Sequence, residues 1–231
     1  MSLYGKLFKR SIPNLFTLCN LYVGFLSIFF AAKGDFKNAS ILILIGMMLD
    51  SMDGRLARML NAQSELGKEL DSLADVVTFG VAPAVLVYYV SFSNHGMVGL
   101  LVAGMFPLFG AFRLARFNVT AKNSQHYFTG IPITAAGGLL TLIVMLKPWI
   151  PSIVITTSFV VLSLLMVSKI KIPSFKDVPI PKYGTIITIL FVLLLYYVYR
   201  SSDFPYLIYF AVPLYVLYFG YRFRKGKQKK N

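Results

Sequence analysis

Long apolar runs alternate with short polar segments along the whole chain of 231 residues. A helix of about 20 apolar residues crosses the hydrocarbon core of a bilayer. Runs of this kind predict eight membrane-spanning helices, at residues 12–32, 36–57, 71–91, 96–117, 130–147, 150–168, 183–200 and 205–221. The apolar positions are continuous rather than alternating, which disfavours a transmembrane β-barrel. The pattern therefore predicts an all-α, polytopic membrane helical bundle.

The first apolar run has the position of a secretory signal peptide, with Ala31 and Ala32 where cleavage would occur. The hydrophobic region of such a peptide has about 7–15 residues, and this run is longer. We therefore interpret residues 12–32 as the first membrane span.

The positive charges test this topology. With the N-terminus inside, the segments expected on the cytoplasmic side hold 19 of the 23 Lys and Arg residues. The four on the outer side are Lys33, Lys37, Lys147 and Arg200. Cytoplasmic loops of membrane proteins carry an excess of Lys and Arg. The distribution thus favours an even number of spans and both termini in the cytoplasm.

The composition indicates the same class of protein. Hydrophobic residues make up 57% of the chain and charged residues 14%, and the mean hydropathy is +0.68. Soluble domains have about 45–50% hydrophobic residues and about 25% charged residues. These values exclude a soluble globular protein and a disordered one. The net charge of +14 follows from the cytoplasmic loops, so it indicates membrane lipids and phosphates as partners and no nucleic acid.

No shift in composition divides the chain. We expect a single integral-membrane domain over residues 1–231, in which residues 222–231 form a basic tail that faces solvent or lipid. Cys19 is the only cysteine, so an internal disulfide is excluded, and no Cys/His spacing indicates a metal site.

The carboxylates are concentrated in one short window, since six of the nine acids lie within residues 50–75. Asp50 and Asp53 are spaced i, i+3, and Asp71 and Asp75 are spaced i, i+4, so each pair shares one face of its helix. The two helices are expected to form a hairpin across a short loop. Four ionised carboxylates beside a bilayer repel one another and are costly unless something compensates them.

Two divalent cations would compensate this charge, because hard cations prefer oxygen ligands. Two cations between four carboxylates can hold a diphosphate for in-line displacement. Gly54, Ala57 and Gly67 lie beside the aspartates and leave room between the helices. Cationic groups on the same side of the membrane come from Arg58, Lys68, Arg113 and Arg116. The alternative is that the acids simply pair with neighbouring arginines at the interface.

From Asp50 the chain reads DSMDGRLARMLNAQSELGKELDSLAD. This matches the pattern D-x2-D-G-x2-A-R-x8-G-x3-D-x3-D at every fixed position. Eight fixed residues in one window are a specific signal. The segment, residues 50–75, resembles the catalytic signature of the CDP-alcohol phosphotransferase family.

This resemblance implies roles for individual residues. Two Mg²⁺ or Mn²⁺ ions would be bound by Asp50, Asp53, Asp71 and Asp75. Asp75 would also act as the general base on the acceptor hydroxyl. Residues implied to bind the CDP-lipid are Asn14, Thr17, Gly54, Ala57, Arg58, Ser64 and Gly67. For Asn14 and Thr17, a role as helix caps at the start of the first span is the alternative.

The wider sequence resembles the branch of the family that transfers to serine. The matching stretches are residues 12–25, 71–84, 112–119, 127–133 and 166–176, whereas the last two predicted spans show no such stretch. Arg113 and Arg116 are spaced i, i+3, and one guanidinium can hold the serine carboxylate through two parallel hydrogen bonds. Asn118 is a further candidate contact. The alternative is that the arginines follow the positive-inside bias or neutralise lipid phosphate.

The function implied by the resemblance is transfer of the phosphatidyl group from CDP-diacylglycerol to the hydroxyl of L-serine, which gives phosphatidylserine and CMP. The residues offer no motif for a covalent nucleophile, so direct displacement is preferred. One alternative is the same chemistry with glycerol 3-phosphate or an inositol phosphate. A remote alternative is a cation transporter, which would carry acids near the midplane of several spans. The resemblance also implies a homodimer in a prokaryotic cell membrane, with the active site facing the cytoplasm.

Overall fold

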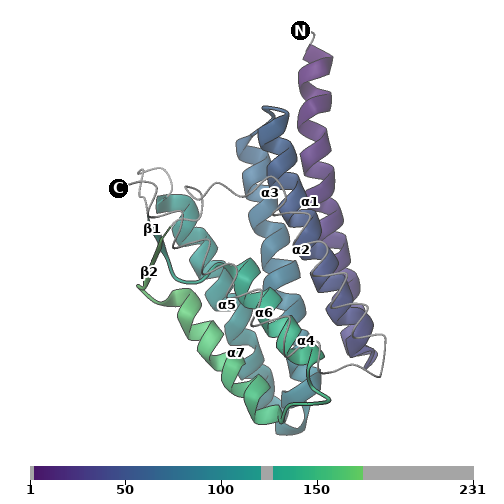
Figure 1. The fold of residues 1–231 in the computed structure, drawn as a ribbon, viewed down its shortest axis with the longest axis vertical. Coiled ribbons are helices and arrows are strands. Elements are labelled where there is room, and N and C mark those ends of the chain that lie inside the picture. The colour runs from purple at the N-terminus through teal and green to yellow at the C-terminus, as the bar shows by residue number, and fades with distance from the viewer. Residues whose placement is uncertain (1–2, 121–126, 174–231) are drawn as a thin grey trace, which may run out of the picture. The chain divides into compact units, whose positions relative to one another are not determined.

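The structure is a computed structural model that describes residues 3–120 and 127–173 (Figure 1). The last two predicted spans and the basic tail lie outside the described residues. Helices account for nearly all of the described chain, which confirms the predicted all-helical class. Besides the connecting segments, the described residues include one short pairing of two strands, β1 (Tyr127–Thr129) and β2 (Lys171–Pro173).

The helices follow one another with short connections. Those before the strand pairing are α1 (Leu3–Ala32), α2 (Phe36–Met59), α3 (Glu65–Asp75), η1 (Val76–Val81), α4 (Ala82–Val87), η2 (Tyr88–Phe92), η3 (Ser93–His95) and α5 (Gly96–Thr120). The later ones are α6 (Ile133–Met145) and α7 (Ser152–Val167). Of the short elements, η1 and η2 are π-helical turns and η3 is a 3₁₀ turn, so the stretch from α3 to η3 is helical without interruption.

Each predicted span that falls in the described ranges corresponds to a helical stretch, although several bounds differ. The first helix begins at Leu3 and not near residue 12, so Pro13 lies inside it. The third begins at Glu65, ahead of the expected residue 71. The fifth starts only at Ile133, because residues before it belong to β1 and a turn at Gly130. The number of membrane spans stays a prediction.

Within the described residues, two helical stretches are long and apolar enough to cross a membrane: Ser11–Ala32 and Glu65–Thr120. The second has 56 residues, far more than one crossing needs. It reverses direction at Gly96, whose φ of 54° and ψ of −134° are not helical. After this turn α5 packs back against η1, α4 and η2. The 56-residue stretch is therefore a helical hairpin.

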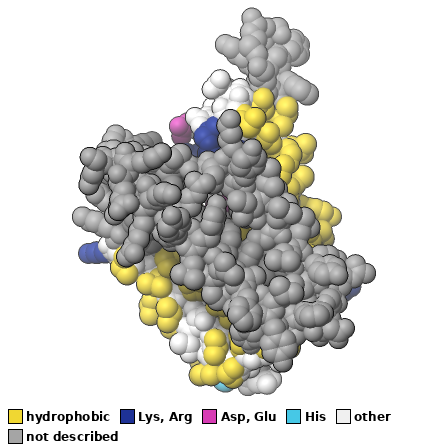
Figure 2. Space-filling model, viewed as in Figure 1, with side chains coloured by type: hydrophobic (Ala, Val, Ile, Leu, Met, Phe, Trp, Pro, Cys, Tyr) yellow, Lys and Arg dark blue, Asp and Glu magenta, His cyan; other side chains and the backbone are white. Residues whose placement is uncertain are grey.

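One face of α1 carries large apolar side chains that are exposed in the described part of the chain. Exposed residues recur at helical spacing along it, namely Leu15, Leu18, Tyr22, Phe25 and Phe29. Figure 2 shows hydrophobic side chains at the surface along the edge where α1 lies. Such a stripe is costly in water and suited to a lipid environment.

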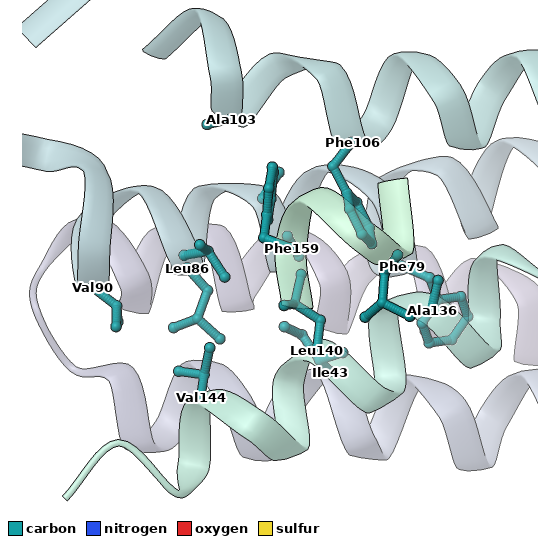
Figure 3. Packing of buried hydrophobic residues seen from close by; sticks show 14 of the residues in the cluster. Ile43, Phe79, Leu86, Val90, Ala103, Phe106, Ala136, Leu140, Val144 and Phe159 are labelled. Atoms are coloured by element: carbon teal, nitrogen blue, oxygen red, sulfur yellow. The ribbon is translucent and has the colours of Figure 1, made fainter. Parts of the chain in front are cut away.

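The core is formed by apolar side chains from α1, α2, η1, α4, η2, α5, α6 and α7 (Figure 3). The Phe159 ring lies at its centre, with centroids 5.2 Å from those of both Phe92 and Phe106. Leu86 and Leu140 are fully buried in the same cluster. This packing fixes α5 and α7 against α4 and η2, which continue the helical stretch that begins with α3.

The predicted loop between the two acidic helices is confirmed as a tight turn after Met59. Asn61 adopts a left-handed conformation with φ of 48°, and the Ala62 amide donates to the Ala57 carbonyl. The Ser64 hydroxyl then accepts a hydrogen bond of 3.0 Å from the Gly67 amide and caps α3. A side-chain oxygen at this position satisfies one of the free amides at a helix start. The turn brings the end of α2 beside the start of α3.

Candidate active site

Three aspartates from two helices meet in one cluster. Carboxylate oxygens of Asp50 and Asp53, on α2, and of Asp71, on α3, all lie within 4.8 Å of one another. The turn between α2 and α3 therefore brings the acidic faces of these two helices together, as the spacing of the aspartates predicts. Asp53 is buried, and the other two are half-buried.

Asp75 completes the acidic cluster from the end of α3. Its side chain is 7% exposed and interacts electrostatically with Asp50, Asp53 and Asp71. Oδ1 of Asp75 and Oδ1 of Asp71 are buried and accept no hydrogen bond from any described residue. Buried carboxylate oxygens are costly without a compensating partner. The cluster thus retains carboxylate oxygens that can still accept a hydrogen bond, and one of them belongs to Asp75, the predicted general base.

This donor set fits hard divalent cations. All of the candidate ligand atoms are carboxylate oxygens, which Mg²⁺ and Mn²⁺ prefer. The close approach of several acids and the two unpartnered buried oxygens leave negative charge to be neutralised. The acidic cluster is therefore compatible with metal binding, and its chemistry does not by itself choose between the two metals.

The first helix supports the cluster through Thr17. Its hydroxyl lies 2.7 Å from Oδ2 of Asp53 and 3.2 Å from the Pro13 carbonyl oxygen. Because α1 begins at Leu3, Thr17 and Asn14 lie well inside it and not at its start. The alternative that these two residues cap the helix is therefore wrong.

Small residues shape the surroundings of the cluster. At Gly54 an added Cβ would lie 3.6 Å from an Arg58 guanidinium nitrogen, so there is room beside this half-buried position. Ala57 is also half-buried on the same helix. At Gly67 an added Cβ would lie 3.0 Å from Oδ1 of Asn14, so this glycine is what lets α3 approach α1.

Cationic side chains border the acids from two helices. Arg58, on α2, is exposed and interacts electrostatically with Asp53. Arg113, on α5, is 6% exposed and interacts electrostatically with Asp75. Its Nε has no hydrogen-bond partner in the described ranges. Both guanidiniums lie close enough to the acids to balance part of their charge.

The other two residues predicted to contact serine, Arg116 and Asn118, already make hydrogen bonds within the fold. Arg116 donates to the carbonyl oxygens of Val167 and Ser168, at 3.3 and 3.5 Å, where α7 ends. The side-chain amide nitrogen of Asn118 donates to the Ser72 hydroxyl at 3.0 Å. Ser72 follows Asp71 in the signature, so this bond joins α5 directly to the acidic helix.

Two residues that the sequence analysis did not single out lie beneath the cluster. Asn20 is fully buried in α1, and its backbone oxygen accepts a 3.0 Å hydrogen bond from the hydroxyl of Thr78 in η1. The available signal was the presence of an amide within an apolar run, where polar side chains are costly and often functional.

Comparison with known proteins covers the residues just described. Residues 10–168 match the model of the CDP-alcohol phosphatidyltransferase family, and this range contains the acidic cluster, Thr17 and Arg113. The chain is 44% identical over 173 residues to a protein of Helicobacter pylori named CDP-diacylglycerol–serine O-phosphatidyltransferase. That match covers 72% of this chain and 73% of the relative.

Further relatives come from distant organisms. A protein of Bacillus subtilis with the same name is 41% identical over 165 residues, which cover 71% of this chain and 91% of the relative. An archaetidylserine synthase of Methanothermobacter thermautotrophicus is 34% identical over 165 residues, or 71% of this chain and 70% of the relative. The family match and the long apolar helices indicate a membrane protein. The chain belongs to the CDP-alcohol phosphatidyltransferase family.

Proposed function

We propose that this protein transfers the phosphatidyl group of CDP-diacylglycerol to the hydroxyl of L-serine, and so produces phosphatidylserine and CMP. The protein is an enzyme, a CDP-diacylglycerol–serine O-phosphatidyltransferase. The relatives that bear this name, at 41–44% identity, support the donor and the acceptor. The single observation that carries the chemistry is the acidic cluster, in which Asp75 keeps a buried oxygen without a partner beside three further aspartates.

Two divalent cations, Mg²⁺ or Mn²⁺, would be held by Asp50, Asp53, Asp71 and Asp75. When bound, such ions neutralise a diphosphate and stabilise the charge on the departing CMP. The protein's own part is to hold four carboxylates in place, which Thr17 supports by its hydrogen bond to Asp53. Metal-ligating carboxylates commonly need such oriented partners.

Asp75 is the general base in this proposal. It takes the proton of the serine hydroxyl while that oxygen attacks the phosphorus linked to the lipid, and the bond between this phosphorus and the CMP oxygen breaks. Its unpartnered Oδ1 supports this role, because an oxygen that accepts no hydrogen bond is available for a proton. No residue forms a covalent intermediate, so the displacement is direct.

The CDP-lipid side of the site comprises Asn14, Thr17, Gly54, Ala57, Arg58, Ser64 and Gly67. The room beside Gly54 and the exposed guanidinium of Arg58 support a phosphate or nucleotide contact there. Ser64 and Gly67 contribute by building the start of α3, since their mutual hydrogen bond caps that helix. Asn14 contributes from α1, where its side chain lies close to Gly67.

The serine side centres on Arg113. A buried guanidinium with an unpartnered Nε, next to the general base, suits the carboxylate of serine. Arg116 supports the site less directly, because its guanidinium already binds the carbonyls at the end of α7. Asn118 holds α5 to the acidic helix through Ser72 and so keeps Arg113 in register with Asp75.

In this proposal the chain is one integral-membrane domain of eight spans, residues 1–231, with both termini in the cytoplasm. The excess of Lys and Arg in alternate loops supports this orientation. The membrane is a prokaryotic cell membrane, the acidic cluster faces the cytoplasm, and the protein is a homodimer.

The decisive experiment measures CMP release by the purified protein with CDP-diacylglycerol and Mn²⁺ or Mg²⁺. L-serine is compared with glycerol 3-phosphate and with an inositol phosphate. Release that requires serine and stops with EDTA is the expected result. Release with another acceptor alone would overturn the serine assignment. No release with any acceptor from folded protein, together with cation flux in sealed vesicles, would favour a transporter.

A further inference from the structure

A second polar layer lies one helical turn away from the acidic cluster. Asn20 follows Thr17 by three residues, Gly46 precedes Asp50 by four, and Thr78 follows Asp75 by three. For Asn20 and Gly46 these spacings keep each residue on the same face of its α-helix as its partner in the site. Thr78 lies in η1, the π-helical turn that directly follows Asp75. The layer is therefore formed by α1, α2 and the turn after α3.

The layer is tightly closed. The Thr78 hydroxyl donates to the Asn20 backbone oxygen at 3.0 Å, and both residues are 0% exposed. A Cβ at Gly46 would overlap the Thr78 methyl group and the Asn20 amide oxygen. A Cβ at Gly24 would overlap the Thr78 hydroxyl and its Cα. The two glycines thus let η1, which begins directly after Asp75, lie against α1 and α2.

The bond uses the backbone of Asn20 and not its side chain. Both Oδ1 and Nδ2 of Asn20 are buried and make no hydrogen bond to any residue in the described part of the chain. The hydroxyl of Thr78 is therefore the side-chain group on which this bond depends.

The π-helical turn explains why the layer matters for Asp75. Such turns are rare in proteins, and those that occur often lie at functional sites. A turn of this kind changes the rotation of the helix after it relative to the helix before it, so a contact that fixes η1 also constrains the rotation of the last residues of α3. The hydrogen bond between Thr78 and Asn20 fixes η1 three residues after the general base.

We propose that Thr78 is a positioning residue, whose hydrogen bond to the Asn20 backbone oxygen holds η1 on α1 and thereby fixes the Asp75 carboxylate relative to Asp50 and Asp53. This inference rests on the proposed function, because it assigns a role within the same site. Thr78 does not touch the reacting atoms, and its effect reaches the reaction only through the position of Asp75.

The test removes one hydroxyl with little change of side-chain volume. Thr78→Val has nearly the shape of Thr and cannot donate to the Asn20 backbone oxygen. Thr78→Ser keeps the hydroxyl and serves as the conservative variant. Ser27→Ala is the matched control, since Ser27 lies two turns further along the same face of α1, is 0% exposed and donates to the Ala39 carbonyl at 2.8 Å.

Four quantities are measured on each purified protein: kcat, the KM of each substrate, the affinity for Mn²⁺ without substrate, and the melting temperature. We expect kcat to fall about 10- to 100-fold in Thr78→Val, the range seen when supporting residues of a metal site are lost. Both KM values should stay near wild type. The melting temperature should fall by a similar amount in Thr78→Val and in Ser27→Ala, because each variant loses one buried hydroxyl that donates to a backbone oxygen. Thr78→Ser and Ser27→Ala should keep their kcat.

Two results would overturn the proposal. One is a wild-type kcat in folded Thr78→Val. The other is a loss of activity that follows the melting temperature and is equally large in Ser27→Ala, which would show a merely structural role. Failure of the proposed function is distinct, because wild-type protein itself would then release no CMP with serine.

Discussion

The hydroxyl of Thr17 lies 2.7 Å from Oδ2 of Asp53, across the interface between α1 and α2. This bond ties the first helix to the acidic cluster, although 36 residues separate the two positions in sequence. Hydrogen bonds to charged groups contribute about 1.5–3 kcal/mol, more than those between neutral groups. Thr17 is thus the contact through which α1 orients one of the candidate metal ligands.

Replacing Thr17 by Val should weaken metal binding, because the side chain keeps its shape and loses the donor to Asp53. We expect Mn²⁺ affinity to fall about 10- to 100-fold, with a matching loss of kcat at subsaturating metal. Titration of the purified protein with Mn²⁺ measures this. Thr17→Ser keeps the hydroxyl and should bind Mn²⁺ as wild type does. An unchanged Mn²⁺ affinity in Thr17→Val would show that Asp53 does not need this bond.

Asp75→Asn should fold but lose turnover, since an amide cannot take the proton of the acceptor hydroxyl. General-base catalysis contributes about 10²- to 10⁴-fold, so kcat should fall by this factor. The assay is CMP release at saturating serine. Asp35→Asn is the control, because Asp35 lies outside the acidic cluster and caps the start of α2 by accepting from the backbone amide of Asn38, which Asn can also do. Near wild-type turnover in Asp75→Asn would remove Asp75 as the base.

The helices and the acidic cluster could be predicted from sequence because both depend on local spacing. Apolar runs of nearly constant length mark the helices, and offsets of three and four residues put Asp50 with Asp53 and Asp71 with Asp75. A turn that begins within a few residues of Met59 then suffices to bring the two pairs together. Helix ends were less predictable, as α1 shows, because polar residues before Ser11 continue the helix.

Contacts between distant segments could not be predicted in the same way. Nothing in the local pattern around Arg116 indicates that it binds the last carbonyls of α7, some 50 residues later. The pairing of β1 with β2 is equally remote, and it joins two of the stretches that carry the family resemblance. The Gly130 amide donates to the Ile170 carbonyl at 3.0 Å there. No periodic pattern of apolar residues in the sequence indicates the π-helical turn after Asp75.

Gly130→Ala should destabilise the protein more than the same change at Gly34. Both glycines have positive φ, of 75° and 80°, but a Cβ at Gly130 would overlap the carbonyl of Met166, whereas the space at Gly34 is open. The shared conformational penalty is about 1–2 kcal/mol, and the overlap adds to it only at Gly130. Melting temperatures of the two variants test this. Equal melting temperatures would show that the turn at Gly130 shifts without cost.

Arg113→Gln should raise the KM of serine about 10- to 100-fold, because a charge-assisted pair with the serine carboxylate contributes about 1.5–3 kcal/mol. The KM of CDP-diacylglycerol should change little. Arg116→Gln is the comparison: its guanidinium binds the Val167 and Ser168 carbonyls, so its loss should lower the melting temperature and leave the serine KM near wild type. Steady-state kinetics with each substrate varied in turn separates the two. If the lipid KM alone rises in Arg113→Gln, then Arg113 contacts phosphate and the serine carboxylate is bound elsewhere.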